Sequence, residues 1–469
     1  MLEINNLTIE LPRRGRVLDH VNLTAVPGQV TAVVGRSGSG ATTLLRCLAR
    51  ALPAGTQGLG RLLWRGRDLS AHDTRGLLVV ADWAITPVTV AVHLRSLTSK
   101  VLDTAQRLGL AEVLGQRLSQ LPADLLARIH LASLALAPAA GLVLVDSVST
   151  AATGDDRQAI ASALRRRAEA GAVVLWADHD LDSVWEHADR LVELDDGLVH
   201  HDGSPEDWFP HRLPEPTLLA LARTLGFPPG RCRDVAGAAE FFHRQGCRPA
   251  PLPTGREPRR GDAVPVASKA LGLQGEDLTL GGRECVGLVD RAGRSEPLAR
   301  ALARQLRGAA LVTGHLPVEA TPRRISRAWE RRHALPDGSV LETAPSLRPD
   351  QPLVSHGSGD LAKLRAALAA GPECPLWLPH PQAGLDAHDA RRLAAELRSG
   401  PPGPRLVTSR DVEFLVRACH RILVVEAGKV VAFGTPNAVA AVLPDPPLVS
   451  QTVGSPRHVR LTEVLEAAP

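Results

Sequence analysis

Apolar residues along the chain form short runs that alternate with amphipathic stretches. The runs at 30–34, 142–145 and 173–176 have the length and apolar content of buried strands. The stretches at 42–50 and 157–170 space their apolar residues as helices do. Because strands alternate with helices in this order, the pattern predicts a parallel sheet within an α/β domain.

The later part of this pattern occurs twice. Residues of the first copy recur 231 positions further on, in the pairs Arg190–Arg421, Gly197–Gly428, Gly203–Gly434 and Pro205–Pro436. A constant offset over several positions indicates duplication. Two earlier landmarks have other offsets, 255 between Val34 and Val289 and 233 between Asp146 and Pro379. The second copy has therefore lost roughly twenty residues between these landmarks.

The segment between the copies has a different composition. Residues 217–225 and 236–244 look helical, whereas 248–261 is rich in proline and arginine. That composition predicts an exposed linker in 248–261. RNA or lipid headgroups remain alternative partners for its arginines.

Composition narrows the class of protein. The chain is 44% hydrophobic and 22% charged, which is typical of a globular protein that buries large cores. Its 54 basic and 50 acidic residues give a net charge of +4, which argues neither for nor against nucleic acid. The six cysteines include no C-x-x-C pair, so we expect reduced thiols rather than disulfides or a zinc site.

The sequence predicts no membrane span. The most apolar run, 131–145, is interrupted by Pro138 and is shorter than the roughly 20 residues that cross a bilayer. The first residues show no basic region followed by an apolar one, as a signal peptide would. We therefore expect any membrane connection to run through a partner.

A glycine-rich segment follows the first apolar run and opens a helix. Residues 35–43, GRSGSGATT, fit the phosphate-binding pattern G-x-x-x-x-G-K-[ST] except that Ala41 stands in place of the lysine. Glycines let backbone N–H groups surround phosphate oxygens, and the helix N-terminus adds a positive field. Thr42 occupies the position whose hydroxyl binds Mg²⁺. The lysine that would bridge the β- and γ-phosphates is absent.

With these motifs the chain resembles an ATP-binding-cassette (ABC) transporter ATPase with two cassettes in tandem. The fold class implied is α/β, with two P-loop NTPase-type ABC cassettes, each a mainly parallel sheet with helices and a helical subdomain. The stretch 213–226 resembles the linker in duplicated ATPases of energy-coupling-factor and cobalt-type importers. The expected segments are cassette 1 at 1–205, a helical extension and Pro/Arg-rich linker at 206–267, a shortened, degenerate cassette 2 at 268–440, and a C-terminal tail at 441–469.

The resemblance assigns roles in the first copy position by position. Asp146 matches the Walker B aspartate of the Mg²⁺ site, and Ser147 stands where the family has its catalytic glutamate. His179 matches the switch histidine that senses the γ-phosphate. Ala81 replaces the glutamine-loop residue, and 121–125 replaces the LSGGQ signature without its serine and glycines. A helix cap for Asp146 and an ordinary core histidine for His179 are the alternative interpretations.

The second copy departs further from the family pattern. Residues 290–297 align with the phosphate loop, but Glu296 replaces the lysine. This change places negative charge where a triphosphate would bind. Pro379, His380 and Arg410 replace the Walker B aspartate, the catalytic glutamate and the switch histidine.

In ABC proteins each nucleotide site forms between the phosphate loop of one cassette and the signature and D-loop of the other. The second copy keeps a D-loop at 384–386 and a signature-like segment at 355–360. The resemblance therefore implies one partly retained site in a pseudo-dimer within one chain. Its expected nucleotide-binding residues are Gly35, Ser37, Gly38, Ser39, Gly40, Ala41, Thr42, Thr43, His179, Ser358, Gly359 and Asp386, with Thr42 and Asp146 holding Mg²⁺.

The implied function is that of an ABC transporter ATP-binding subunit, with weak ATP and Mg²⁺ binding in cassette 1 and little or no hydrolysis. Its expected partners are integral membrane transporter subunits, and its expected location is cytoplasmic, at the inner face of the plasma membrane. No nucleic acid is expected. A nucleotide-free scaffold or regulatory protein derived from an ABC ATPase is the alternative. A translation-type ABC protein acting on ribosomes fits less well, because that class has a long basic helical linker and this linker is rich in proline.

Overall fold

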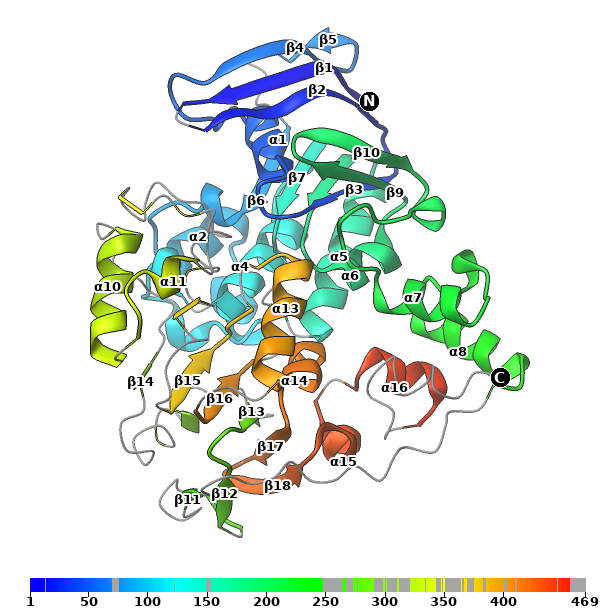
Figure 1. The fold of residues 1–469 in the computed structure, drawn as a ribbon. Helices are drawn as coiled ribbons and strands as arrows, with labels where there is room; N and C mark the ends of the chain where they lie inside the picture. Colours follow the sequence, from blue (N-terminus) through cyan, green and yellow to red (C-terminus); the bar gives the residue numbers. More distant parts are fainter. Residues whose placement is uncertain are drawn as a thin grey trace. The chain divides into compact units, whose positions relative to one another are not determined.

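The computed structural model divides into two compact units, Met1–Pro216 and Thr217–Pro469. We describe each unit by itself; Figure 1 shows their elements. The structure describes residues 1–469 except for 13, 70–75, 122, 149–151, 153, 248–263, 267–272, 276, 291–297, 300, 302–309, 312–320, 334, 343–346, 348, 351–363, 365–366, 369–374, 383–384, 400–402, 410, 445 and 456–469.

A six-stranded sheet forms the centre of unit 1. Its strands lie in the order β10–β9–β3–β8–β7–β6, and all neighbours are parallel except β9 and β10. The bounds are β3 Val30–Gly35, β6 Leu77–Ala81, β7 Leu142–Asp146, β8 Val173–Ala177, β9 Arg190–Asp195 and β10 Leu198–Gly203. Every residue of β3, β7 and β8 is buried, as expected for parallel strands covered on both faces. The three strands predicted from apolar runs are therefore confirmed.

An antiparallel sheet completes the core of unit 1 (Figure 1). It contains β2 (Gly15–Ala25), β1 (Leu2–Leu11), β4 (Gln57–Trp64) and β5 (Arg67–Asp68), in that order. Buried residues of β1 and β2 share one hydrophobic cluster with β3, β7, β8, β9 and the helix α1, Ala41–Leu48. This packing covers one face of the parallel sheet and fixes α1 against the end of β3.

A helical subdomain has a hydrophobic cluster of its own. It contains α2 (Val90–Leu97), α3 (Val101–Arg107) and α4 (Ala123–Leu136), whose buried side chains pack together. Outside this subdomain, α5 (Gly154–Glu169) precedes β8 and α6 (Leu181–His187) follows it. Helices α1 and α5 confirm the helices predicted at 42–50 and 157–170, with small shifts at their ends.

Unit 2 contains a sheet of the same design. Its order is β18–β17–β13–β16–β15–β14, which is the order of the first sheet, strand for strand. The bounds are β13 Cys285–Asp290, β14 Ala310–Leu311, β15 Leu376–Pro379, β16 Arg405–Thr408, β17 Arg421–Glu426 and β18 Lys429–Gly434. A short antiparallel pair, β11 (Val264–Val266) and β12 (Leu278–Leu280), accompanies it.

The duplication extends to the hydrogen-bond register. Thr31 lies opposite Arg190 in unit 1, and Val286 lies opposite Arg421 in unit 2, which preserves the offsets of 255 and 231. The backbone N–H after the Walker B position donates across the sheet in both units, from Ser147 to Ala177 and from His380 to Thr408. Two halves of the same design are therefore present in tandem.

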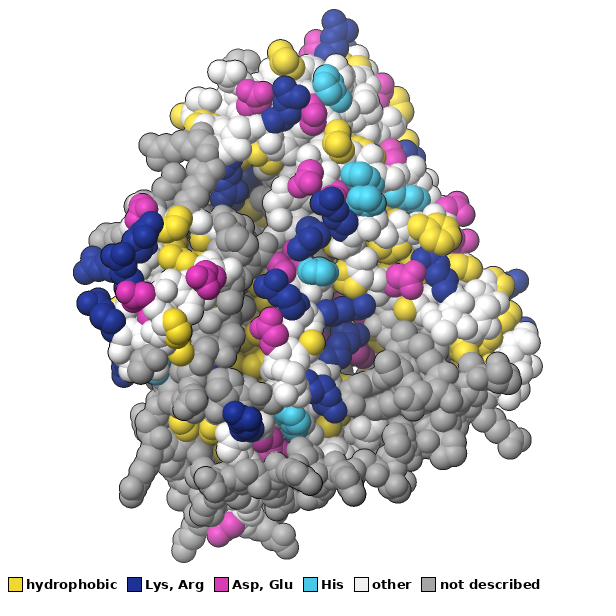
Figure 2. Space-filling view, in the orientation of Figure 1, with side chains coloured by type: hydrophobic (Ala, Val, Ile, Leu, Met, Phe, Trp, Pro, Cys, Tyr) yellow, Lys and Arg dark blue, Asp and Glu magenta, His cyan; other side chains and the backbone are white. Residues whose placement is uncertain are grey.

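Further helices belong to unit 2. The predicted helices between the copies are present as α7 (Thr217–Thr224) and α8 (Val235–Arg244), which pack against α16 (Leu448–Val453). The predicted linker at 248–261 lies outside the described residues. The remaining helices are α10 Pro322–His333, α11 Ser339–Glu342, α13 Ala387–Arg398, α14 Val412–Ala418 and α15 Pro436–Val439. Basic side chains gather over α10 in Figure 2.

The two units differ in how they pair the repeated arginine. Arg421 lies in a buried ion pair with Glu284, with its Nη2 donating at 2.6 Å, and it also donates to the carbonyl of Thr279. Arg190, its counterpart, pairs with Asp202 at 2.7 Å on a partly exposed surface. The same position therefore carries a buried charge in unit 2 and a surface charge in unit 1.

Arg421→Met should lower the free energy of unfolding of unit 2 by about 3–5 kcal/mol, because Glu284 becomes an uncompensated buried charge. The matched change Arg190→Met should cost unit 1 at most about 1 kcal/mol, because that pair is partly solvated. Urea unfolding followed by amide hydrogen exchange separates the two units. Equal losses in both variants would contradict the prediction.

Candidate functional site

The candidate site of unit 1 lies where its parallel strands end. Gly35, Ala81, Asp146 and Ala177 are the last residues of β3, β6, β7 and β8. The register places Ala81 opposite Asp146, and Asp146 opposite Ala177. Residues separated by more than a hundred positions therefore share one edge of the sheet, the edge where open α/β sheets bind ligands.

The loop between β3 and α1 depends on its glycines. Gly40 has φ +105°, and a Cβ there would lie 2.5 Å from Leu18 Cδ2. A Cβ on Gly35 would lie 2.3 Å from Ser39 Oγ and 2.4 Å from the carbonyl oxygen of Leu194. Side chains are therefore excluded at both positions, and the backbone can turn tightly after β3.

This loop presents an anion-binding helix terminus. Gly40 is the N-cap of α1 and supplies no side-chain cap. The N–H groups of the first turn, which includes Ala41, Thr42 and Thr43, have no partners within the helix. Together with the helix dipole, they favour a phosphate or another anion. Since Ala41 replaces the lysine, backbone groups rather than an ammonium supply the positive field.

The turn between β9 and β10 is hydrogen-bonded to the glycine loop that joins β3 to α1. The N–H of Gly197 donates to the carbonyl of Ser39 at 3.1 Å, and the N–H of Asp19 donates to the carbonyl of Gly197 at 2.9 Å. Ser39 N–H closes a turn onto the Arg36 carbonyl at 2.9 Å. The glycine loop is thus braced by the β9–β10 hairpin, which lies more than 150 residues later in the sequence.

Asp146 is already held by two side-chain donors. Its side chain is buried; Trp83 Nε1 donates to Oδ2 at 2.7 Å and Ser147 Oγ donates to Oδ1 at 3.1 Å. Arg46 lies over the Trp83 ring, 5.3 Å from its centroid. Burial lowers the pKa of Arg46, while the charge of Asp146 opposes that shift. Sequence reasoning missed Trp83 and Arg46, because no spacing in the motif relates them to the carboxylate.

This arrangement decides which parts of a Mg–nucleotide complex fit. The glycine loop and the uncapped α1 terminus fit a phosphate group. The Asp146 carboxylate is 4% exposed and accepts one hydrogen bond at each oxygen, so Trp83 and Ser147 set its orientation. Each oxygen keeps a second lone pair, with which it could bind a Mg²⁺ ion or a water of its shell.

His179 follows β8 beside a buried carboxylate. Asp178 accepts hydrogen bonds from the backbone N–H of His179 at 2.8 Å and from Trp176 Nε1 at 3.0 Å. Burial raises the pKa of Asp178. Among the described residues, Nδ1 of His179 has no hydrogen-bond partner. The imidazole is therefore positioned by its backbone and retains a ring nitrogen for a ligand.

The described counterparts in unit 2 carry different side chains. Asp290 ends β13 at the position of Gly35, and His380 repeats the positive φ of Ser147, at 45° against 57°. Asp386 is fully buried and caps α13 by accepting from the N–H of Asp389. The two units therefore share backbone conformation at these positions although their side chains differ.

Several predicted positions cannot be placed. Outside the described residues lie Pro122, 291–297 with Glu296, 355–360 with Ser358 and Gly359, Gly384 and Arg410. The four-segment division and the roles of the site residues remain predictions.

The signature helix α4 contains a buried histidine. His130 is 5% exposed, and its Nε2 lies 3.5 Å from Oδ1 of Asp82, the residue after the predicted glutamine-loop position Ala81. Burial lowers the pKa of His130 to about 4, and the nearby imidazole of His93 adds to the shift. His93 Nε2 in turn lies 2.9 Å from Ser133 Oγ. The helical subdomain therefore requires a neutral His130.

Acid should destabilise unit 1 through His130. The unfolded chain takes up this proton near pH 6.5, whereas the folded chain does so only near pH 4, so stability falls across that interval by about 3 kcal/mol. Urea unfolding of His130→Leu between pH 7 and pH 4 should show a correspondingly smaller loss than the wild type. His388→Leu, on the exposed face of α13, is the control. His388→Leu should keep the wild-type pH dependence; if His130→Leu keeps it as well, the assignment to His130 is wrong.

Comparisons with known proteins agree with this geometry. Residues 18–147 match the ABC transporter family. The chain is 26% identical to a Streptomyces avermitilis protein named as an ABC transporter ATP-binding protein, in an alignment that covers 95% of this chain and 96% of that protein. It is 29% identical over 256 residues to the Fe(3+) ions import ATP-binding protein FbpC of Streptomyces coelicolor, covering 51% of this chain and 71% of FbpC.

Solved structures share the fold over the whole chain. An RNase-L inhibitor aligns over 98% of this chain and 97% of its own, with a TM-score of 0.56 and 16% identity. A structure of ribosome-bound archaeal Pelota and ABCE1 aligns over 94% of this chain and 80% of that chain, with a TM-score of 0.61 and 17% identity. Identities this low show the fold alone. Among the described residues, no helix is both long and apolar enough to cross a membrane.

Proposed function

We propose that this tandem-cassette ABC transporter ATP-binding protein binds the phosphates of ATP weakly in unit 1 and hydrolyses ATP little or not at all. The observation that carries the proposal is the state of Asp146, whose two oxygens are held by Trp83 and Ser147 beside an intact glycine loop. The ABC family uses ATP and Mg²⁺; here the glycine loop and Asp146 are kept, whereas Ala41 and Ser147 replace the lysine and the catalytic glutamate.

Retained phosphate binding is supported by the geometry of the loop. Gly35 and Gly40 stand where side chains are excluded, and the first turn of α1 offers unpaired N–H groups. The missing ammonium at Ala41 removes a charge-assisted hydrogen bond worth roughly 1.5–3 kcal/mol, so binding should be weak.

Loss of hydrolysis is supported by the residues beside Asp146. Phosphoryl transfer requires a group that positions the attacking water and cations that stabilise the developing charge. Ser147 holds the position of the catalytic glutamate; its hydroxyl donates to Asp146 and, unlike a carboxylate, is too weak a base to activate a water. Neither the lysine nor the glutamate of the family is present in either copy.

We further propose that integral membrane transporter subunits are the partners of this protein, at the inner face of the plasma membrane. The support is the likeness to ATP-binding proteins named for transporters, among them FbpC. The energy-coupling-factor or cobalt-type subclass rests on the stretch 213–226. Ser358, Gly359 and Asp386 would complete the nucleotide site as the opposite half of a pseudo-dimer. The scaffold alternative predicts that no nucleotide binds at all.

Restoring the lysine tests nucleotide binding directly. Ala41→Lys should tighten the binding of Mg-ATP by on the order of 10-fold to 100-fold, because the ammonium regains its contact with the β- and γ-phosphates. The matched change in the second copy, Glu296→Lys, should have little effect. Isothermal titration calorimetry on the full chain measures both. Equal gains in the two variants, or no binding in any, would remove the proposal.

Turnover of ATP tests the loss of catalysis. The purified chain should release phosphate no faster than heat-denatured protein, because the groups that position water and stabilise charge are absent. Asp146→Asn should therefore leave the background unchanged. A phosphate-release rate clearly above background that disappears in Asp146→Asn would show an active site.

A further inference from the structure

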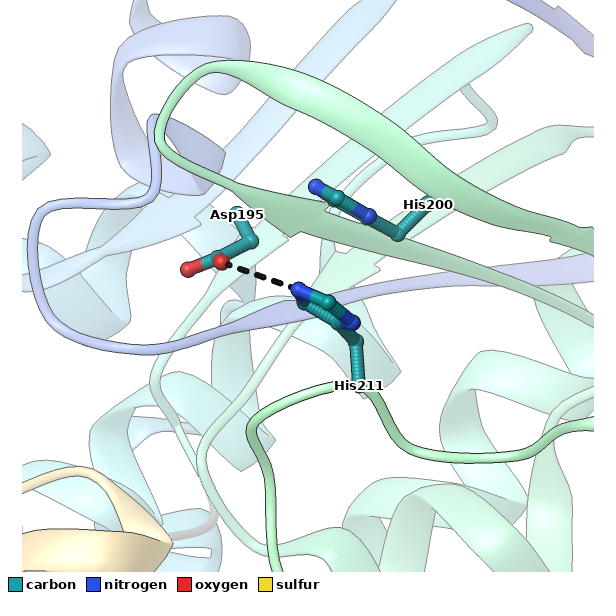
Figure 3. A group of neighbouring side chains, drawn as sticks. All are labelled: Asp195, His200 and His211. Carbon is teal, nitrogen blue, oxygen red and sulfur yellow. Dashed lines mark ion pairs between the residues drawn. The ribbon is translucent and has the colours of Figure 1, made fainter.

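Three potential metal ligands meet on the hairpin that closes the sheet of unit 1. Asp195 is the last residue of β9, His200 lies in β10, and His211 lies in the segment after that hairpin (Figure 3). One ligand atom from each lies within 4.8 Å of the other two. Asp195 is buried, and the two histidines are exposed to solvent. Figure 2 shows histidine side chains gathered on the surface over this hairpin.

A break in strand pairing brings His200 into the group. Val199 pairs with Leu194 and His201 with Glu193, so His200 is an extra residue in β10. Such a bulge redirects the side chain of the extra residue. It also explains why two consecutive histidines of one strand have different surroundings: His201 Nε2 lies 3.2 Å from the carbonyl of Ser204, outside the group.

A buried carboxylate fixes the position of His211. Glu193, on β9, is 1% exposed and accepts from the backbone N–H of His211 at 3.0 Å. The same carboxylate accepts from Trp208 Nε1 at 2.8 Å. The segment after the hairpin is therefore tied to the strand that carries Asp195. The three ligands therefore lie on two paired strands, β9 and β10, and on a segment anchored to β9.

The ligand types select the kind of ion. We propose that Asp195, His200 and His211 bind a divalent transition-metal ion of the Zn²⁺ type. Imidazole nitrogens favour Zn²⁺ and its first-row neighbours over Mg²⁺ and Ca²⁺, which prefer oxygen ligands. The two imidazole rings are stacked with centroids 4.2 Å apart and an angle of 9° between them. His211 Nε2 lies 3.8 Å from Asp195 Oδ2.

The distances are close to those of a loaded site. Ligand atoms bound to Zn²⁺ at about 2.0–2.1 Å in a tetrahedron stand roughly 3.3 Å from one another. The group must therefore contract by at most about 1.5 Å. Because both imidazoles are exposed, their rotation would supply this movement without a change in β9. With three protein ligands, the fourth position of the ion would be open to water or to another ligand.

Arg212 pairs with the carboxylate of Asp195. Its Nη1 lies 3.2 Å from Asp195 Oδ2 and 3.3 Å from Asp196 Oδ2. The guanidinium thus neutralises the buried carboxylate and competes with a cation for the same oxygen. Because Asp196 is a second partner, Arg212 can move aside and remain paired. Removing the guanidinium should therefore strengthen metal binding.

The second copy provides an internal comparison. Its hairpin has the same bulge, with Val425 paired to Val430 and Val424 to Ala432, so Val431 holds the position of His200. Glu426 holds the position of Asp195. The backbone that presents the ligands is therefore common to both copies, whereas the imidazole is present only in unit 1. Valine is therefore the substitution for His200 that the second copy suggests.

The test uses the full chain, purified without a polyhistidine tag and in the absence of nucleotide. Titration with ZnCl₂ by calorimetry, and with CoCl₂ by visible absorption, should show one site above the background of weak surface binding. His200→Val should weaken that site by at least the 10-fold to 100-fold that even second-shell changes cost. His201→Val, on the same strand, should leave it unchanged. Arg212→Gln should tighten it.

The difference between the two histidine variants decides the proposal. Equal affinities in His200→Val and His201→Val would overturn it, as would the absence of any site in the wild type. Asp195→Asn provides an independent check, since it keeps the shape of the side chain and removes its charge; unchanged affinity in this variant would also overturn the proposal. Far-ultraviolet circular dichroism of each variant separates loss of the site from loss of the fold. The outcome does not depend on whether ATP binds at the glycine loop.

Discussion

The parallel pairing of β7, β8, β3 and β9 is the constraint on which unit 1 depends. It brings the ends of strands from distant parts of the sequence to one edge, with Asp146 opposite Ala177 and Gly35 opposite Leu194. The close approach of Gly35 to the Leu194 carbonyl leaves no room for a Cβ, so strand pairing and loop chemistry are set by the same contact. The β9–β10 turn then braces the loop through Gly197. Everything that a ligand would meet at this edge follows from that pairing.

The comparison of the two copies separates what folding requires from what catalysis requires. The strand order, the register, the hairpin bulge and the positive φ after the Walker B position are the same in both units. Apolar burial and backbone hydrogen bonds maintain these features whatever the side chains at the strand ends. Charged side chains at the strand ends are not stabilised in this way, because a buried charge is costly unless a specific donor or opposite charge pairs with it. In unit 1 the carboxylate of Asp146 has found donors in Trp83 and Ser147, while in unit 2 the aspartate itself has become Pro379.

The hairpin of β9 and β10 contacts both the glycine loop and the proposed metal site of unit 1. Its turn donates a hydrogen bond to the phosphate loop, and its strands carry Asp195 and His200. Glu193 and Asp195 lie two residues apart on β9, so they point to the same side of the sheet and serve one group of residues. The acid at 193 holds the following segment by its backbone, and the acid at 195 faces the histidines. One strand of the central sheet thus braces the glycine loop through its turn and also supplies a rigid base for a second, separate cluster.

The sequence by itself determined the features that depend on local pattern. Apolar runs predicted β3, β7 and β8, the offset of 231 predicted the repeat, and the glycines of 35–40 predicted a phosphate loop without its lysine. Each of these can be read from the order of residues along the chain, because apolar runs, glycine spacing and repeated segments do not depend on knowing which distant residues make contact. Tertiary structure alone decided that Trp83 caps Asp146, that Arg421 is buried against Glu284, and that His200 meets Asp195 and His211. These groups come together only when separate segments pack. The bulge at His200 and the orientation of the Trp83 indole produce no periodic pattern in the sequence, so they could not be predicted from it.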